Sequence, residues 1–351
     1  MEEKIKLTQF AKGAGCGCKI APAVLEEILS KSRTNSAVDT NLLVGNTTND
    51  DAAVYDLKNG TALLVTADFF MPIVDDAYTF GQVAAANSLS DVYAMGGKPI
   101  TAIALLGWPI DKLPAALASE VMAGAKKICE EAGVVISGGH TIDSAEPFFG
   151  LSVNGMVAIP NIKRNSTAKA GNKILLSKAL GVGILATAQK RGVLQTEHEE
   201  ILKKSLTSLN SYGEKLGEDI SVQAMTDVTG FGIIGHLIEM CEGSGLSATI
   251  HFDKLPIIPE TKEYIDKNIL PDATYRNWNA YNSKIKIDPS VDQKTSFMIL
   301  PDPQTNGGLL IAVEADAVEA VINRAKAHHV ELVEVGEFTE KLLDLVQINL
   351  H

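Results

Sequence analysis

The residues best suited to chemistry lie near the start of the chain, in the segment GAGCGCK at residues 13–19. Its glycines leave the backbone free to adopt positive φ angles and to approach a ligand closely. A thiol reacts, or binds soft ligands, as the thiolate, and a nearby lysine lowers its pKa. We therefore expect a mobile loop in which Cys16 handles a soft ligand and Lys19 supplies positive charge.

The four cysteines differ in their surroundings. Cys129 and Cys241 occur in apolar helical patterns, where a cysteine is usually a small buried side chain. Cys16 and Cys18 could instead form a disulfide or half of a zinc site, but the sequence offers no Cys or His cluster to complete such a site. We assign the chemistry to Cys16, and the role of Cys18 stays undecided.

Aspartates form the second group of candidates. Asn59-Gly60 separates two β-prone runs, and this dipeptide is the strongest short-range signal for a two-residue hairpin turn. With that turn, Asp51 and Asp68 stand directly opposite each other, with Cβ atoms about 5 Å apart. Because facing carboxylates repel, we predict a cation between them, with Asp50 alongside. A solvated strand end and a β-bulge that breaks the register are the alternatives.

Two further aspartates occupy positions that suit a metal-bound phosphate. A helix predicted over residues 80–95 places Asn87 and Asp91 on one face. A carboxylate in such an apolar stretch is paired or metal-bound if it is buried, and otherwise points to water. A strand that ends at Asp227 leads through glycines into a helix, and a helix N-terminus attracts anions. Asp227 could also be a simple cap of that helix.

Two glycine-containing turns give weaker signals. The sequence GGHT at residues 138–141 follows a buried apolar run, and a turn there would offer backbone N–H groups to an anion. A histidine that only caps the turn is the alternative for His140. Residues 302–308 (DPQTNGG) precede another apolar run, and we interpret them as a tight turn without a chemical role.

The elements that must position these residues fall into two halves, each mixing strand-like and helical patterns. A length of 351 residues predicts about two domains. The polar stretch at residues 160–167 breaks both periodicities and marks the boundary. We predict a mobile catalytic loop over 1–19 and two α+β domains, over 20–160 and 161–351, with one longer helix over 199–216.

Composition excludes several classes of partner. The net charge of -12 argues against nucleic acids and anionic membranes. Apolar runs stay shorter than the ~18 residues that suggest a membrane span, and the N-terminus MEEK lacks a signal-peptide pattern. Four cysteines without a framework spacing fit a reducing compartment. We expect a cytoplasmic protein with no nucleic-acid or membrane partner.

The hard and soft candidates suggest one reaction. Carboxylates suit Mg²⁺ and hence phosphates, whereas thiols suit soft metals, sulfur or selenium species. A thiol loop over a carboxylate site suggests that a soft nucleophile is delivered to a phosphoryl group. The sequence contains no GxxxxGK[ST] loop, which excludes a P-loop enzyme.

These motifs resemble those of the selenophosphate synthetases (selenide, water dikinases). The resemblance covers nearly the whole chain in the expected order, and it rests on residues 15–19 (GCGCK), 41–46 (NLLVGN), 50–54 (DDAAV), 66–70 (TADFF), 90–97 (SDVYAMGG), 138–140 (GGH), 226–232 (TDVTGFG) and 302–305 (DPQT). It implies the two-domain architecture of the aminoimidazole ribonucleotide synthetase superfamily, with helices packed on mixed sheets and a flexible Gly/Cys-rich N-terminal loop. The cysteine-containing loop separates this family from its relatives.

The resemblance also implies an activity. ATP, selenide and water would give selenophosphate, orthophosphate and AMP. Mg²⁺ dependence, stimulation by K⁺ and a homodimer built through the N-terminal domains are further implications, with residues 20–160 binding nucleotide and metal. The form in which selenium arrives, and a partner protein that delivers it, stay open.

Individual residues follow by position. The resemblance makes Cys16 and Lys19 catalytic, with Lys19 also near the nucleotide phosphates, and it matches three residues with metal ligands, namely Asp51, Asp91 and Asp227. The positions that match ATP contacts are Thr48, Asn49, Asp50, Asp68, Asp91, Gly139, His140 and Thr141. Asp68 is a further candidate for contact with the metal. Asn306 departs from the family, which usually has serine there.

Two rival functions remain. Another ATP-using enzyme of the superfamily would act on a carbon-based substrate without needing Cys16. A non-catalytic selenium or soft-metal carrier would use Cys16 and Cys18 without turning over ATP. Four aspartates in phosphate-site contexts count against the carrier.

Overall fold

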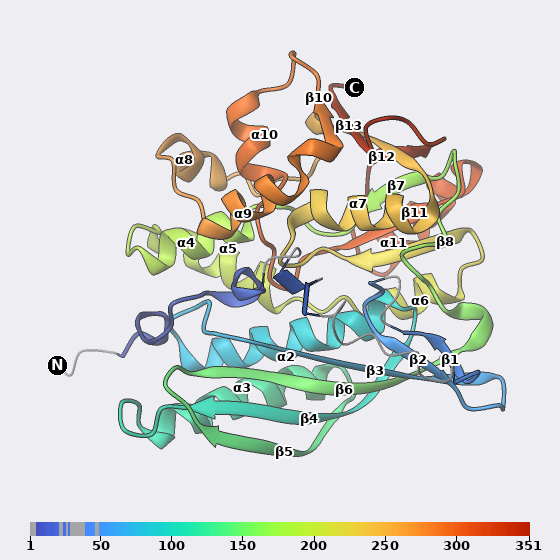
Figure 1. The fold of residues 1–351 in the computed structure, drawn as a ribbon. Helices are drawn as coiled ribbons and strands as arrows, with labels where there is room; N and C mark the ends of the chain where they lie inside the picture. Colours follow the sequence, from blue (N-terminus) through green and yellow to red (C-terminus); the bar gives the residue numbers. More distant parts are fainter. Residues whose placement is uncertain (1–4, 21–23, 26, 29–38, 46–48) are drawn as a thin grey trace.

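The structure, a computed structural model, describes residues 5–20, 24–25, 27–28, 39–45 and 49–351. Two mixed sheets with their helices are stacked on each other, the first in the lower half of Figure 1 and the second in the upper half. The chain thus has the α+β class and two-sheet organisation that its sequence predicts. The boundary after residue 160 lies between the two sheets and stays a prediction, as does a separate mobile unit over residues 1–19.

The first sheet exposes an apolar face. Its strands, in the order β1-β2-β3-β6-β4-β5, are β1 (Leu42–Val44), β2 (Ala53–Asp56), β3 (Thr61–Phe70), β6 (Phe148–Ala158), β4 (Lys98–Trp108) and β5 (Val135–Asp143). Only the β4–β5 pair among these is parallel. Side chains alternate between the two faces. Leu64 and Leu151 are fully buried on the inner face, whereas Val65, Phe69 and Ile103 on the outer face are 38%, 55% and 42% exposed.

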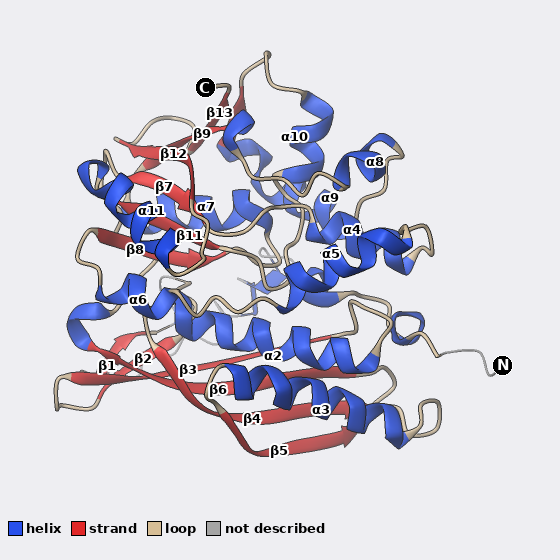
Figure 2. Ribbon diagram, turned by 180° about the vertical axis from the view of Figure 1, so that it is seen from behind, coloured by secondary structure: helices blue, strands red, loops and turns tan. Residues whose placement is uncertain are grey.

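Helices α2 (Ala77–Ala94) and α3 (Ala115–Glu131) cover the inner face, and α2 lies between the first sheet and the second domain (Figure 2). The Asp76 side chain caps α2 by accepting a hydrogen bond from the Thr79 N–H at 2.9 Å. Beyond the end of the helix at Ala94, Gly96 has a φ of 74°, which lets the Gly97 N–H reach the Val92 carbonyl at 3.0 Å. The predicted helix is confirmed, with an earlier start.

The second sheet is buried on both faces over residues 174–176, 224–227 and 309–313. Its strands, in the order β10-β13-β9-β12-β7-β11-β8, are β10 (Ile285–Ile287), β13 (Val346–Asn349), β9 (Ser247–His251), β12 (Val333–Thr339), β7 (Lys173–Leu176), β11 (Leu309–Val313) and β8 (Val222–Asp227). Ile174 and Leu176 pack in the core that includes helix α7 (Gly232–Ser244). Leu175, between them, packs in a second core with helix α11 (Val318–Ala327).

The other helices surround the second sheet and the top of α2 (Figure 1). They are α4 (Val182–Lys190), α5 (Thr196–Thr207), α6 (Gly213–Glu218), α8 (Thr261–Asp266), α9 (Asp272–Tyr281) and α10 (Gln293–Ile299). The single helix predicted over 199–216 is wrong, because the chain leaves α5 after Thr207 and starts α6 at Gly213. Asn210 between them donates to Ser90 Oγ and the Gly307 carbonyl, which fixes a turn there. Among the described residues, no helix has both the length and the apolar character needed to cross a bilayer.

The β2–β3 hairpin differs from the predicted one by one residue. Val54 pairs with Leu64, so residues 58–60 form a three-residue loop, with positive φ at Lys58 and Gly60. The Asp56 carboxylate accepts a hydrogen bond from the Lys58 N–H at 2.7 Å, which stabilises the start of this three-residue loop. The strand pairing ends at Ala53, and Asp51 does not face Asp68. The predicted carboxylate pair across the hairpin is therefore wrong.

Candidate functional site: a carboxylate triad and a buried thiol

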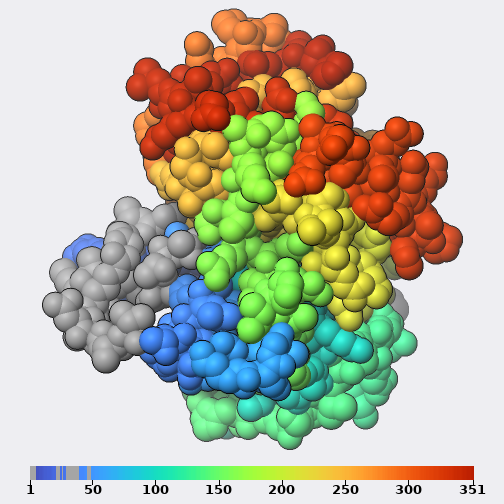
Figure 3. Space-filling view, turned by 90° about the vertical axis from the view of Figure 1, so that its right-hand side faces the viewer, coloured from blue at the N-terminus to red at the C-terminus, as the bar shows by residue number. Residues whose placement is uncertain are grey.

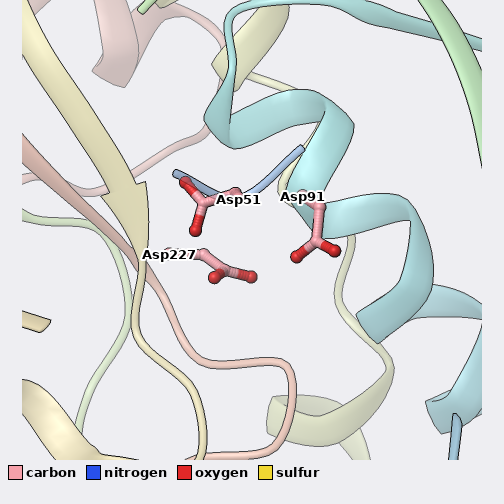
Figure 4. Close-up of side chains that lie close together, drawn as sticks. All are labelled: Asp51, Asp91 and Asp227. Atoms are coloured by element: carbon pink, nitrogen blue, oxygen red, sulfur yellow. The ribbon is translucent and has the colours of Figure 1, made fainter. Parts of the chain in front are cut away.

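Three aspartates from distant parts of the chain point toward one another (Figure 4). Asp51 precedes β2, Asp91 lies on α2 and Asp227 ends β8. One carboxylate oxygen from each lies within 4.8 Å of those of the other two. We call these residues the carboxylate triad. It joins the two domains, because α2 belongs to the first sheet and β8 to the second.

Each member of the triad accepts a hydrogen bond from a neutral hydroxyl group. Thr226 Oγ1 donates to Asp51 Oδ1 at 2.9 Å, Thr66 Oγ1 donates to Asp91 Oδ2 at 2.5 Å, and Ser90 Oγ donates to Asp227 Oδ2 at 2.5 Å. Asp51 Oδ2 is buried and has no hydrogen-bond partner among the described residues. Hydroxyl groups thus orient the three carboxylates, and one carboxylate oxygen of the triad keeps no protein partner among the described residues.

The electrostatics of the triad favour a bound cation. Burial raises the pKa of each of the three carboxyl groups, and neighbouring carboxylates raise those of Asp51 and Asp91 further. A cation between the oxygens would remove this cost of ionisation. Hard oxygen donors and the unpartnered Asp51 oxygen fit Mg²⁺.

Lys19 supplies the positive charge next to the triad. The Asp68 carboxylate, and after it Cys16, Asp91 and Asp227, raise the pKa of the Lys19 ammonium, while desolvation opposes them. Its Nζ lies 5.9 Å from the centre of the Phe231 ring. Asp68 itself stands outside the triad, and its Oδ2 accepts a hydrogen bond from Asn87 at 2.7 Å. The Asp68 carboxylate therefore contacts the Asn87 side chain, and not the carboxylate of Asp51 that the hairpin prediction placed there.

Cys16 is buried, with 1% of its surface exposed. It lies in a short 3₁₀ helix (Gly15–Cys18), in a stretch that we call the thiol segment (residues 11–18). Its N–H donates to Thr305 Oγ1 at 2.9 Å, and its Sγ donates to Asn87 Oδ1 at 3.2 Å. Residues 302–308 form an irregular connection with a bend at 305–306 before β11 (Leu309–Val313), and the tight turn stays a prediction. The connection also contacts the thiol segment, which our interpretation of it missed.

The thiol in this closed arrangement does not have the lowered pKa that we expected. Burial raises the pKa of Cys16 well above its ordinary value, although Lys19 acts in the opposite direction. The expectation considered the sequence neighbours and not the desolvation that closure brings. Cys16 and Cys18 are both free thiols, and so are Cys129 and Cys241, which are buried as predicted.

Glycine is required where the thiol segment approaches the second domain. Gly15 has a φ of 49°, and a Cβ added there would lie 2.4 Å from Thr305 Oγ1. On the facing loop, a Cβ at Gly230 would lie 2.5 Å from the Cys16 carbonyl oxygen. The segment therefore fits closely against the loops after β8 and before β11.

Comparison with known proteins identifies the family. The AIR synthase related protein family matches with its N-terminal domain at residues 49–157 and its C-terminal domain at residues 169–346. The chain is 51% identical to the selenide, water dikinase of Photorhabdus laumondii, over 97% of both chains, and 50% identical to that of Haemophilus influenzae, also over 97% of both. The chain belongs to the selenide, water dikinase family.

Solved structures with the same fold are more distant in sequence. The thiamine monophosphate kinase of Aquifex aeolicus superposes with a TM-score of 0.67 at 17% identity, covering 93% of this chain and 96% of the other. The hydrogenase maturation protein HypE of E. coli superposes with a TM-score of 0.62 at 20% identity, covering 92% and 94%. At this identity the likeness establishes the shared fold alone.

Some nucleotide positions suggested by the dikinase resemblance lie near the junction of the two domains. The Asn165 N–H donates to Asp50 Oδ1 at 2.8 Å, and Asn165 Nδ2 donates to the Asn49 carbonyl at 2.9 Å. Hydrogen bonds from Asn165 thus connect the residues before Asp51 to the stretch at residues 160–167 between the two sheets. Thr48, the neighbouring candidate, lies outside the described residues.

The structure does not bring Gly139, His140 and Thr141 to the triad. These residues are exposed and lie within β5, which continues through them and pairs with Ala104 and its neighbours in β4. The predicted anion-binding turn is therefore wrong. Two strands separate β5 from β3, where Asp68 lies, so about 14 Å of sheet intervenes.

Asn87 is the central residue that sequence reasoning noticed but did not assign. It contacts the Cys16 thiol and Asp68, and its Oδ1 also accepts the Asn306 N–H at 2.8 Å. Asn306, where the resemblance leads us to expect serine, has a φ of 52° that asparagine tolerates better than most residues. Its Nδ2 donates to the Leu206 and Ser208 carbonyls, both at 2.8 Å.

The hydroxyl partners of the triad were also missed. Ser90 and Thr226 precede Asp91 and Asp227 in the sequence, so a hydroxyl group beside a candidate ligand was an available signal. Thr66 gave no such signal, because its partner Asp91 lies 25 residues away in the sequence. The same holds for Thr305, whose contact with Cys16 spans 289 residues.

Proposed function

We propose that this protein makes selenophosphate from selenide, ATP and water and releases AMP and orthophosphate. Family membership supports the reaction, since relatives that are about half identical over nearly the full chain are selenide, water dikinases. The observation that carries the proposal is the position of Lys19, which interacts electrostatically with Cys16 and with the triad residues Asp91 and Asp227. The Cys16 thiol itself contacts Asn87, which lies four residues before Asp91 on α2. A soft atom, a cation and a hard-metal site are thus brought together.

The roles of the residues follow from this arrangement. Asp51, Asp91 and Asp227 would hold Mg²⁺, which neutralises phosphate oxygens when bound. Lys19 neutralises the γ-phosphoryl oxygens, and Cys16 holds or delivers the selenium atom. In the first transfer a P–Se bond forms as the bond between the γ-phosphorus and the bridging oxygen breaks, leaving ADP. Water then attacks the β-phosphorus of ADP, giving AMP and orthophosphate.

The nucleotide contacts and the dimer complete the proposal. Asn49, Asp50 and Asp68 are the nucleotide candidates on the side of the triad, and Thr48 is a further candidate. The outer face of the first sheet supports a homodimer, because it exposes Val65, Phe69 and Ile103. In such a dimer the exposed residues Gly139, His140 and Thr141 are available to the nucleotide of the partner copy. Stimulation by K⁺, a cytoplasmic location and a selenium-delivery protein are carried by the resemblance or the composition alone.

The test is anaerobic ³¹P NMR of the purified protein with ATP and Mg²⁺, with and without selenide. We expect AMP, orthophosphate and a phosphorus–selenium resonance to appear together and only with selenide. ADP as the final product, or turnover indifferent to selenide, would point to another ATP-using enzyme of the superfamily. Tight selenium binding without turnover would point to a carrier.

A further inference from the structure

The thiol segment is held from the second domain by two cationic side chains. Lys190, the last residue of α4, donates from Nζ to the carbonyls of Ala11, Lys12 and Gly13, at 2.9, 3.2 and 2.9 Å. Arg276 on α9 donates from Nη2 to the Gly17 carbonyl. An ammonium group has three N–H donors, so these three carbonyls use all of them. All the hydrogen bonds that the Lys190 ammonium can donate thus go to backbone carbonyls of the segment.

Packing alone does not hold this part of the segment. A cavity of about 430 Å³ lies against it and is lined by Lys12, Gly13, Ala14 and Gly17 together with Lys190 and Arg276. Glycine and alanine also offer little side-chain surface to bury. On the side that faces the cavity, the hydrogen bonds from the two cations add to the restraints that the segment has elsewhere, which include the Gly15 N–H bond to the Met71 carbonyl at 3.0 Å and the contacts of Cys16.

Closure and chemistry make opposite demands on Cys16. The thiol is 1% exposed in this arrangement, so a selenium species cannot reach it from solvent. The proposed reaction requires the thiol to receive selenium and then to lie beside Lys19 and the triad. A restraint made of hydrogen bonds to backbone carbonyls can be broken and remade without unfolding either domain.

We infer that Lys190 and Arg276 form a latch that holds the thiol segment closed and so keeps Cys16 against Asn87, four residues before the triad residue Asp91 on α2. Both are positioning residues, since they contact the backbone of the segment and not the thiol. This inference rests on the proposed function for the role of Cys16. The latch itself can be measured without any turnover.

The first test is alkylation of the full-length protein by iodoacetamide at one fixed pH, followed by peptide mass spectrometry of each cysteine. In Lys190→Met, which keeps an apolar stem and removes the donors, we expect Cys16 to react about tenfold faster or more, since bonds to a charged donor are strong. Lys190→Met combined with Arg276→Met should exceed either single change. Lys326→Met, in the last turn of α11, is the matched control and should leave the rate unchanged.

The other cysteines separate latch opening from general loosening. Cys129 and Cys241 are buried in the cores of the two domains, and their alkylation should stay slow in every variant. An unchanged rate at Cys16 in the double variant would overturn the latch. A rate that rises equally at Cys129 and Cys241 would overturn it too, because it would report unfolding.

The second test measures kcat and the KM for Mg-ATP separately in the latch variants. With the latch weakened, the closed segment is less populated, so kcat for selenide-dependent turnover should fall while KM for Mg-ATP stays the same. Faster Cys16 alkylation with unchanged kcat would show that closure does not limit the reaction and would overturn the positioning role. If wild-type protein made no selenophosphate, the proposed function would fail, and the alkylation result would still decide the latch.

Discussion

The two parts of the site, the carboxylate triad with its hard oxygen ligands and the thiol segment with its soft sulfur, are built in different ways. The carboxylate triad comes from the end of a strand, a buried helix and the start of a hairpin, and each carboxylate is oriented by a hydroxyl group. The thiol segment ends in a short 3₁₀ helix, and hydrogen bonds of its own backbone connect it to Met71 in the first domain and to Thr305, Lys190 and Arg276 in the second. The triad is thus preorganised, although its carboxylates repel one another. The thiol segment can be released from the domains when its hydrogen bonds break.

The largest expected effect comes from breaking the triad. Asp91→Asn should lower Mg²⁺-dependent kcat/KM on the order of 10³-fold, because a bound metal contributes several kcal/mol to charge stabilisation. It should also raise the stability of the metal-free protein by about 1 kcal/mol, since one repelling charge is gone. Thermal melts and turnover measure the two effects. The exposed Asp111→Asn is the control, and a matching loss of activity there would contradict the assignment.

Removing the Cys16 sulfur should lower selenide-dependent turnover without weakening Mg-ATP binding. In Cys16→Ser we expect selenide-dependent turnover to fall on the order of 10²-fold or more, because a serine hydroxyl neither binds selenium nor ionises as readily. Mg-ATP binding, measured by calorimetry, should be retained. Cys18→Ser is the neighbouring control and is expected to stay active. Full turnover in Cys16→Ser would refute the role in delivery.

A smaller effect should follow from loosening one member of the triad. Ser90→Ala removes the hydroxyl group that orients Asp227 and should weaken the apparent Mg²⁺ affinity about tenfold. The Cys16 alkylation rate should not change, since Ser90 makes no contact with the thiol segment among the described hydrogen bonds. Ser119→Ala, on the exposed surface of α3, is the control. Equal Mg²⁺ titrations in the two variants would contradict this role for Ser90.

The smallest effect is a shift with pH. The folded-state pKa values of the triad carboxyls are raised above their ordinary value of 3.8, so the stability they allow is complete below about that pH. It is lost as the pH rises through their folded-state pKa values. The melting temperature of metal-free wild type should therefore fall with rising pH relative to Asp91→Asn, and saturating Mg²⁺ should reduce this difference. A difference that grows in the opposite direction would contradict the repulsion.

The two parts of the site also differ in how far the sequence predicts them. Residue types alone made Cys16 and Lys19 candidates, and helix and strand patterns made Asp91 and Asp227 candidates. Asp51 became a candidate through a hairpin register that proved wrong, because the turn holds three residues and not two. The true neighbours of Asp51 are 40 and 176 residues away in the chain, and local patterns do not encode such distances.

The closure of the thiol segment could not be predicted for a similar reason. Burial of Cys16 depends on Asn87, Thr305 and Gly230, which come from three separate elements. A pattern read along residues 13–19 shows an unanchored loop, since its anchors belong to the rest of the chain. The same limit explains the direction of the thiol pKa, because desolvation is a property of the folded surroundings.

Helix α2 has a further consequence. Sixteen of its eighteen residues are buried, from Ala77 to Ala94, with the first sheet on one side and the second domain on the other. Amide hydrogens in such a helix exchange with solvent only when the whole molecule opens, whereas those held by a few surface bonds exchange through local fluctuations. Deuterium uptake should therefore be slow at the amides of α2 and fast at the amides of residues 11–18.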